Sequence, residues 1–152
     1  MIKFGEIGNY KVAKNFGYLT TDVALKNGDI VTYDLATKKV ALPTSETAKK
    51  AGLAVVMNVI DKPDIKTPDD YTIEAGEHPR IFTLASLKGL TLVMNDAEIK
   101  TGYAEITVGD KLVADTDGKL VKASNVSGYA EYLEVIEKVA FGGNGLVAVV
   151  KA

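Results

Sequence analysis

Short runs of β-branched and other apolar residues, each closed by a turn signal, recur along most of this chain. Runs of this kind, separated by glycine, proline, asparagine or aspartate, predict short strands joined by tight turns. The strands expected from this pattern are residues 30–33, 39–42, 53–60, 71–74, 80–84, 90–94, 111–114 and 119–122. We therefore expect a mostly β fold, a compact barrel-like or sandwich-like domain of short strands and hairpins with one or two short helices.

Two segments within this pattern need separate arguments. Residues 53–60 form the longest uninterrupted apolar run, which predicts a buried central strand. Residues 129–139 alternate in polarity, which favours a strand, although glutamate, leucine and lysine also favour a helix. We prefer the strand because Gly142-Gly143-Asn144-Gly145 follows it and residues 146–151 predict a returning strand. Together they predict a long C-terminal hairpin.

A short helical segment is expected between two of the strands. Residues 45–51 contain good helix formers, with Thr44 or Ser45 placed to cap the first turn and Gly52 placed to end the last one.

A diverged internal repeat is visible within the strand pattern. Gly28-Asp29 is followed by Asp34 and then by Gly52, and Gly109-Asp110 is followed by Asp115 and then by Gly128. The two copies correspond to residues 25–60 and 106–152. Either they are two related hairpin units, or they reflect turn chemistry that recurs by chance.

The first 22 residues lack any clear period and are expected to form an N-terminal arm ahead of a single β-rich domain at residues 23–152. Four aromatic side chains lie in this segment among glycines: Phe4, Tyr10, Phe16 and Tyr18. Exposed aromatic rings on a loop favour burial against a partner, so these four residues are our candidate partner-binding residues. The alternative is that the rings fold back onto their own domain as an edge strand.

Composition excludes several classes of function. The chain has 152 residues, 47% of them hydrophobic, which suffices for one folded domain without a disulfide or a bound metal. It has no cysteine and one histidine, so thiol chemistry and cysteine-based zinc sites are excluded. The net charge of −2, with no long basic run, argues against nucleic acid as a partner. No apolar run spans a membrane and no signal peptide is recognisable, so we expect synthesis in the cytoplasm.

Candidate chemical motifs are few, and each has a simpler interpretation. Residues 115–118 (DTDG) resemble the start of a calcium loop, but the position that should carry the closing glutamate is Val126, so a hairpin turn is favoured. Residues 142–145 are glycine-rich without the helix that a phosphate loop opens. His78 is expected on an exposed loop, and the acidic residues between Asp61 and Asp70 are expected to be solvated. We therefore expect a protein that is not an enzyme and has no cofactor, catalytic residue or metal site.

The short strands led by Gly-Asp or Gly-Glu resemble the head decoration (cement) proteins of tailed bacteriophages. The similar stretches are residues 25–31 (LKNGDIV), 73–77 (IEAGE), 108–113 (VGDKLV), 118–123 (GKLVKA), 128–131 (GYAE) and 145–149 (GLVAV). The resemblance covers roughly residues 23–150 and lies in this pattern of short strands, not in a diagnostic motif. It implies a small β-rich virion protein, a homo-oligomer with a trimer favoured, that binds the major capsid protein on the outside of the expanded head and stabilises it.

Two other functions stay open. One is another phage structural module, such as a head-fibre base or a tail component. The other is a small-ligand or hydrolytic domain that uses His78 or the acidic residues between Asp61 and Asp70.

Overall fold

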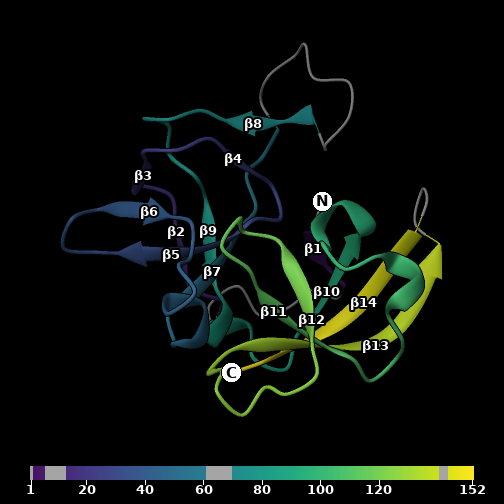
Figure 1. Ribbon diagram of the computed structural model, residues 1–152. Coiled ribbons are helices and arrows are strands. Elements are labelled where there is room, and N and C mark those ends of the chain that lie inside the picture. Colours follow the sequence, from purple (N-terminus) through teal and green to yellow (C-terminus); the bar gives the residue numbers. More distant parts are fainter. Residues whose placement is uncertain (1, 6–12, 61–69, 141–143) are drawn as a thin grey trace.

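The computed structural model describes residues 2–5, 13–60, 70–140 and 144–152, and it confirms the mostly β fold (Figure 1). Neither of the two large sheets closes into a barrel, so the architecture is sandwich-like. The described helical residues form four short 3-10 turns, more than the one or two short helices expected: η1 (Thr47–Lys49), η3 (Leu84–Leu87), η4 (Asp96–Glu98) and η5 (Tyr103–Glu105). Such turns leave no helical period in the sequence because each spans a single turn.

The described residues form two six-stranded sheets and one separate strand pair. Sheet A is antiparallel throughout and runs in the order β1 (Ile2–Phe4), β10 (Thr91–Asn95), β14 (Asn144–Lys151), β13 (Tyr132–Ala140), β11 (Lys111–Ala114) and β12 (Leu120–Ala123). Sheet B runs in the order β2 (Asn15–Phe16), β9 (Ile81–Thr83), β7 (Leu53–Val56), β5 (Ile30–Asp34), β6 (Lys39–Ala41) and β3 (Thr20–Thr21), of which only the pairing of β3 with β6 is parallel. The separate antiparallel pair is β4 (Leu25–Lys26) with β8 (Thr72–Ile73), near the top of Figure 1.

The larger hydrophobic core lies between sheets A and B. Leu92 and Leu133 reach it from sheet A, and Ile30 and Phe82 reach it from sheet B. A second core lies on the other face of sheet B, where the β4–β8 pair covers it. The molecule is therefore layered as sheet A, first core, sheet B, second core and the β4–β8 pair.

The apolar run that begins at Leu53 owes its continuity to this layering. Successive strand residues point to opposite faces. Leu53 and Val55 accordingly enter the first core, and Ala54 and Val56 enter the second. The prediction of a buried strand is confirmed for β7, but the strand ends at Val56. Residues 57–60 lie outside it, the first two half-buried and the last two exposed.

The described part of the N-terminal segment, residues 2–5 and 13–22, is integrated into the two sheets, which corrects the expectation of a separate arm. β1 pairs with β10, β2 pairs with β9, and β3 pairs with β6. Ile2 and Leu19 are fully buried in the two cores. These strands are only two or three residues long, which is too short for an alternating pattern to show in the sequence.

Three four-residue turns of the described chain share one geometry. Each ends in glycine followed by an acidic residue, and the glycine has a positive φ of 104°, 89° or 93° in turns 26–29, 74–77 and 107–110. The carboxylate of the acidic residue accepts the N–H of the first turn residue at 2.6–2.7 Å. In each turn, the glycine N–H donates to the carbonyl oxygen of one residue in another segment, and the N–H of that same residue donates to the carbonyl oxygen of the acidic residue. For the three turns in order, that residue is Val56, Thr21 and Val135. These Gly-acid turns confirm the turn signals and anchor each turn to a neighbouring strand.

The two proposed repeat units have the same local topology. In the first, β5 follows a Gly-acid turn and lies between β7 and β6. In the second, β11 follows the equivalent turn and lies between β13 and β12. The second unit then extends into the predicted C-terminal hairpin of β13 and β14, so strand is the correct interpretation of most of residues 129–139.

Candidate functional site

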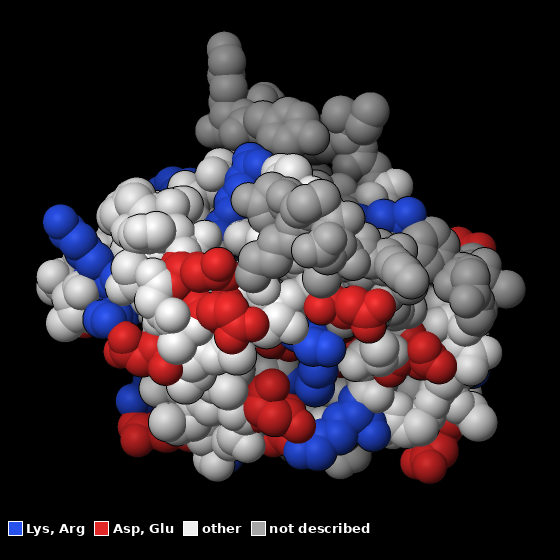
Figure 2. Space-filling view, turned by 90° about the horizontal axis from the view of Figure 1, so that it is seen from above, with Lys and Arg blue, Asp and Glu red and all other residues white. Residues whose placement is uncertain are grey.

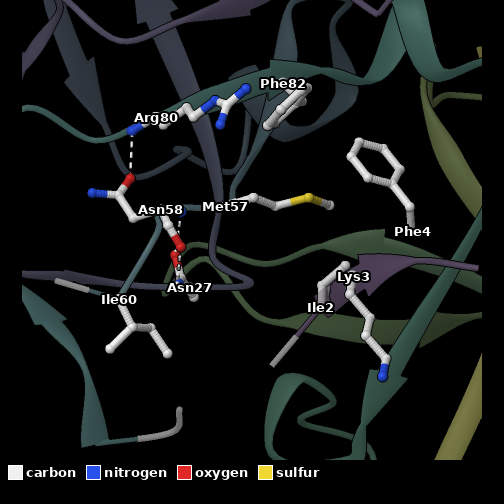
Figure 3. Close-up of a pocket in the computed structure, with 9 residues that line it drawn as sticks. All are labelled: Ile2, Lys3, Phe4, Asn27, Met57, Asn58, Ile60, Arg80 and Phe82. Atoms are coloured by element: carbon white, nitrogen blue, oxygen red, sulfur yellow. Dashed lines mark hydrogen bonds between the residues drawn. The ribbon is translucent and has the colours of Figure 1, made fainter. Parts of the chain in front are cut away.

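One surface pocket, of about 290 Å³, combines aromatic and apolar walls with polar groups (Figure 3). Its apolar walls come from β1, from β9 and from the residue after β7, through Ile2, Phe4, Phe82 and Met57. In Figure 3, the side chain of Met57 points toward the ring of Phe4. The pocket thus lies where the edge of sheet A meets sheet B.

Two aromatic rings form one wall of this pocket. The ring of Phe4 meets the ring of Phe82 edge to face, with 5.2 Å between centroids and an interplanar angle of 87°. Antiparallel pairing with β10 fixes Phe4 opposite Leu92, so its position depends on sheet A. Pairs of this geometry contribute about 0.5–1.5 kcal/mol beyond their buried area.

Two asparagines hold the polar side of the pocket together. The backbone N–H of Asn58 donates to Oδ1 of Asn27 at 2.6 Å, and Nδ2 of Asn27 donates to the carbonyl oxygen of Asn58 at 3.0 Å. Oδ1 of Asn58 in turn accepts the backbone N–H of Arg80 at 2.5 Å. These bonds, drawn in Figure 3, tie the first Gly-acid turn, the segment after β7 and the segment before β9 into one rigid rim.

Arg80 supplies the positive charge of the rim. Its guanidinium carbon lies 5.0 Å from the centroid of the Phe82 ring, a cation–π arrangement. Within the part of the chain that the structure describes, no ion pair engages this guanidinium. Lys3 also borders the pocket, but Figure 3 shows its side chain directed away from the two rings. The arrangement can bind an anionic group beside an apolar one.

A charged cluster lies on the other side of Asn27. Nζ of Lys119 makes ion pairs with Asp29 and Glu98, both at 2.9 Å, and the two acidic side chains are almost fully buried. Burial by itself lowers the pKa of Lys119, but the carboxylates of Glu98 and Asp29 outweigh it and hold that pKa above its usual value. This cluster joins the first repeat unit to the second, which is a structural role.

Glu131 forms a second polar link between the sheets. It precedes β13 of sheet A, and its Oε2 accepts the backbone N–H groups of Gly52 and Leu53 at the start of β7, at 3.1 and 2.7 Å. Its other oxygen, Oε1, is buried without a hydrogen-bond partner in the described structure. Burial raises the pKa of the Glu131 carboxyl, and the bonds from Leu53 and Gly52 oppose that rise.

The structure separates the aromatic residues that the sequence singled out. Phe4 lies in the pocket, whereas Phe16 packs against the second core, with its ring 5.4 Å from that of Tyr33 and 6.0 Å from that of Tyr18. Tyr18 is 54% exposed, and Tyr10 lies outside the described residues. Phe4 and Phe16 therefore serve their own domain at least in part, and the role of the four residues in partner binding stays a prediction.

The pocket residues Arg80, Asn58 and Asn27 were not singled out by sequence reasoning. One signal could have found the first of them, because Arg80 is the only arginine among the 18 basic residues of the chain. The asparagine pair joins residues 31 positions apart, and no local pattern reports such a contact.

The remaining sequence candidates show no assembled site. His78 is exposed as expected, with Nδ1 3.2 Å from the carbonyl oxygen of Leu19. Residues 115–118 form a hairpin turn, and residues 61–69 of the acidic stretch lie outside the described residues. Among the residues that are described, no group of three or more potential metal ligands is placed to hold an ion, and no helix is long and apolar enough to cross a membrane.

No protein-family model matches the chain, and no curated protein matches it either.

Proposed function

We propose that this chain is a structural protein of a tailed-phage virion that binds the outer surface of the expanded capsid and stabilises it. The observation that supports the proposal most is the repeated Gly-acid turn. Its three copies, at residues 26–29, 74–77 and 107–110, overlap three of the six stretches in which the sequence resembles head decoration proteins, residues 25–31, 73–77 and 108–113. These three stretches therefore share one turn geometry as well as a similar sequence.

The physical demands of capsid decoration suit this molecule. A decoration protein needs a rigid body and repeated weak contacts, but no reactive groups. Many copies on a symmetric shell, or several sites within one oligomer, convert modest affinities into tight attachment. Under this proposal the partner is the major capsid protein, the chain is a homo-oligomer with a trimer favoured, and the mature protein resides in the virion after synthesis in the host cytoplasm.

The charge distribution fits a protein partner better than a polyanion. Figure 2 shows acidic and basic side chains intermingled over one face of the molecule, without a field of one sign. Nucleic-acid binding commonly relies on clustered lysines and arginines. The described residues on the face drawn in Figure 2 lack the clustered positive charge on which such binding relies.

Co-sedimentation with capsids tests the proposal. Purified chain is mixed with expanded, undecorated capsids of the virus that encodes it, and with unexpanded procapsids as the control. We expect saturable binding to the expanded capsids at a fixed number of copies per shell and little binding to procapsids. Binding to neither particle would overturn the proposal, and binding only to tails or head fibres would favour the alternative virion module.

A small-ligand domain is the second candidate, and the pocket at Arg80 is the observation that favours it. A ligand of that kind would be a small organic anion with an apolar body. Binding of such anions by the isolated chain at micromolar concentration, together with absence from virions, would favour this candidate over the first.

A further inference from the structure

That residue 80 is an arginine and not a lysine bears on which ligand the pocket can bind. Every other basic residue in the sequence is a lysine, and the single arginine stands beside the Phe4–Phe82 wall. Lysine provides surface charge equally well, but only arginine combines stacking on an aromatic face with a planar fork of donors that matches a carboxylate. The site therefore has the chemistry for planar, bidentate recognition of an anion.

The main chain at Arg80 is held independently of its side chain. Its N–H donates to Oδ1 of Asn58, and its C=O accepts the N–H of Met57 at 2.9 Å. The half-buried side chain then lies over Phe82 without an ion-pair partner in the described part of the chain. A cation positioned in this way has lost part of its hydration, and a carboxylate that reaches it gains more than it would from an exposed lysine.

We propose that this pocket is the contact site for an acidic segment of the major capsid protein. A glutamate or aspartate of that segment binds the Arg80 guanidinium through two parallel hydrogen bonds. A neighbouring apolar side chain of the same segment enters the space lined by Phe4, Met57 and Phe82. The inference rests on the proposed function for the identity of the partner, and on charge complementarity for the chemistry of the segment.

Three variants test this site in the capsid co-sedimentation assay. Arg80→Met removes the charge and keeps most of the side-chain bulk, and Arg80→Lys keeps the charge without the planar fork. Lys88→Met is the matched control, because Lys88 is exposed and lines no part of the pocket. We expect about tenfold or greater loss of capsid affinity for Arg80→Met, an intermediate loss for Arg80→Lys and no change for Lys88→Met.

Thermal melting of the free variants separates binding from folding. Because the backbone bonds of Arg80 are unaffected by either substitution, we expect all three variants to melt within two or three degrees of the parent. If Arg80→Met binds capsids as tightly as the parent does, the inference is wrong while the proposed function stands. If Arg80→Met instead melts much lower, the arginine serves the domain's own stability and the inference is also wrong.

A peptide experiment tests the ligand chemistry of the pocket independently of capsid binding. The probe is the synthetic hexapeptide Gly-Ser-Leu-Glu-Ser-Gly at millimolar concentration, followed by amide chemical shifts of the isolated protein. We expect shifts at residues 57–58 and 80–82, and their loss when the peptide glutamate is replaced by glutamine or when the protein carries Arg80→Met. Shifts that survive both changes, or no shifts at all, would overturn the assigned ligand chemistry.

Discussion

Gly28 shows how strictly single positions are constrained in this fold. Its φ of 104° lies in a region that residues with a side chain rarely adopt, and a Cβ built at this position would lie 2.5 Å from the carboxyl carbon of Glu98. Glu98 cannot move freely because it is buried and paired with Lys119. Two independent restrictions, backbone conformation and space, therefore act at this one residue.

Replacing Gly28 by alanine tests both restrictions against a matched site. Gly76 occupies the same position in another Gly-acid turn, with a φ of 89° and nothing within 4 Å of the built Cβ. We expect Gly76→Ala to cost about 1–2 kcal/mol through backbone strain alone. Gly28→Ala should cost at least about 1 kcal/mol more because it also displaces the buried carboxylate. Urea unfolding measures both, and equal losses would show that the Glu98 contact is unimportant.

The elements of this fold differ in how visible they are in the sequence. Turns and the longer strands are encoded locally. Asn27-Gly28-Asp29 predicts a turn, and an apolar run such as that at β7 predicts a strand buried on both faces. The pocket is not encoded locally, because Asn27, Asn58 and Arg80 come together only when three separate segments pack. The N-terminal strands escaped prediction for a related reason, since pairing with distant partners rather than their own pattern defines them.

The boundary of β7 can be tested with a pair of aspartate substitutions three residues apart. Val56 is fully buried in the second core and is the last residue of the strand, whereas Val59 is 71% exposed. Val56→Asp places an unpaired charge in the core, so we expect a loss of roughly 3 kcal/mol or more. Val59→Asp should change the unfolding free energy by no more than about 0.5 kcal/mol. Similar denaturant midpoints for the two variants would contradict the assigned strand boundary.

Alanine substitutions can likewise separate the buried from the exposed aromatic residues of the N-terminal segment. Phe4 packs against the first core and the Phe82 ring, so we expect Phe4→Ala to cost about 2–4 kcal/mol in unfolding free energy. Tyr18 is mostly exposed, and Tyr18→Ala should cost well under 1 kcal/mol in the isolated protein. A Phe4→Ala variant as stable as the parent would show that the Phe4 ring contributes little to the domain's own core.

At the scale of the whole molecule, the two sheets are joined by polar links as well as by the first core. The link through Glu131 depends on pH, because burial raises the pKa of its carboxyl. The folded state therefore binds this proton more tightly than the unfolded state does. The resulting stabilisation is fully present below the ordinary glutamate pKa, about 4.3, and is lost as the pH rises through the higher pKa of the folded state.

Glu131→Gln isolates this contribution, since glutamine can still accept the N–H groups of Gly52 and Leu53 but does not ionise. The two proteins are compared by urea unfolding at a series of pH values. We expect the difference in unfolding free energy to be constant below about pH 4 and to shift in favour of glutamine as the pH rises towards neutral. A difference that does not change with pH would show that Glu131 titrates normally in the folded protein.

Capsid decoration is the central proposal for this molecule, and it can be tested directly. The most direct measurement is an electron cryo-microscopy reconstruction of expanded, undecorated capsids after incubation with saturating purified protein. We predict added density on the outer surface at symmetry-related positions. The two-sheet fold should fit this density with the Arg80 pocket against a capsid subunit. A reconstruction indistinguishable from that of the untreated capsids would contradict it.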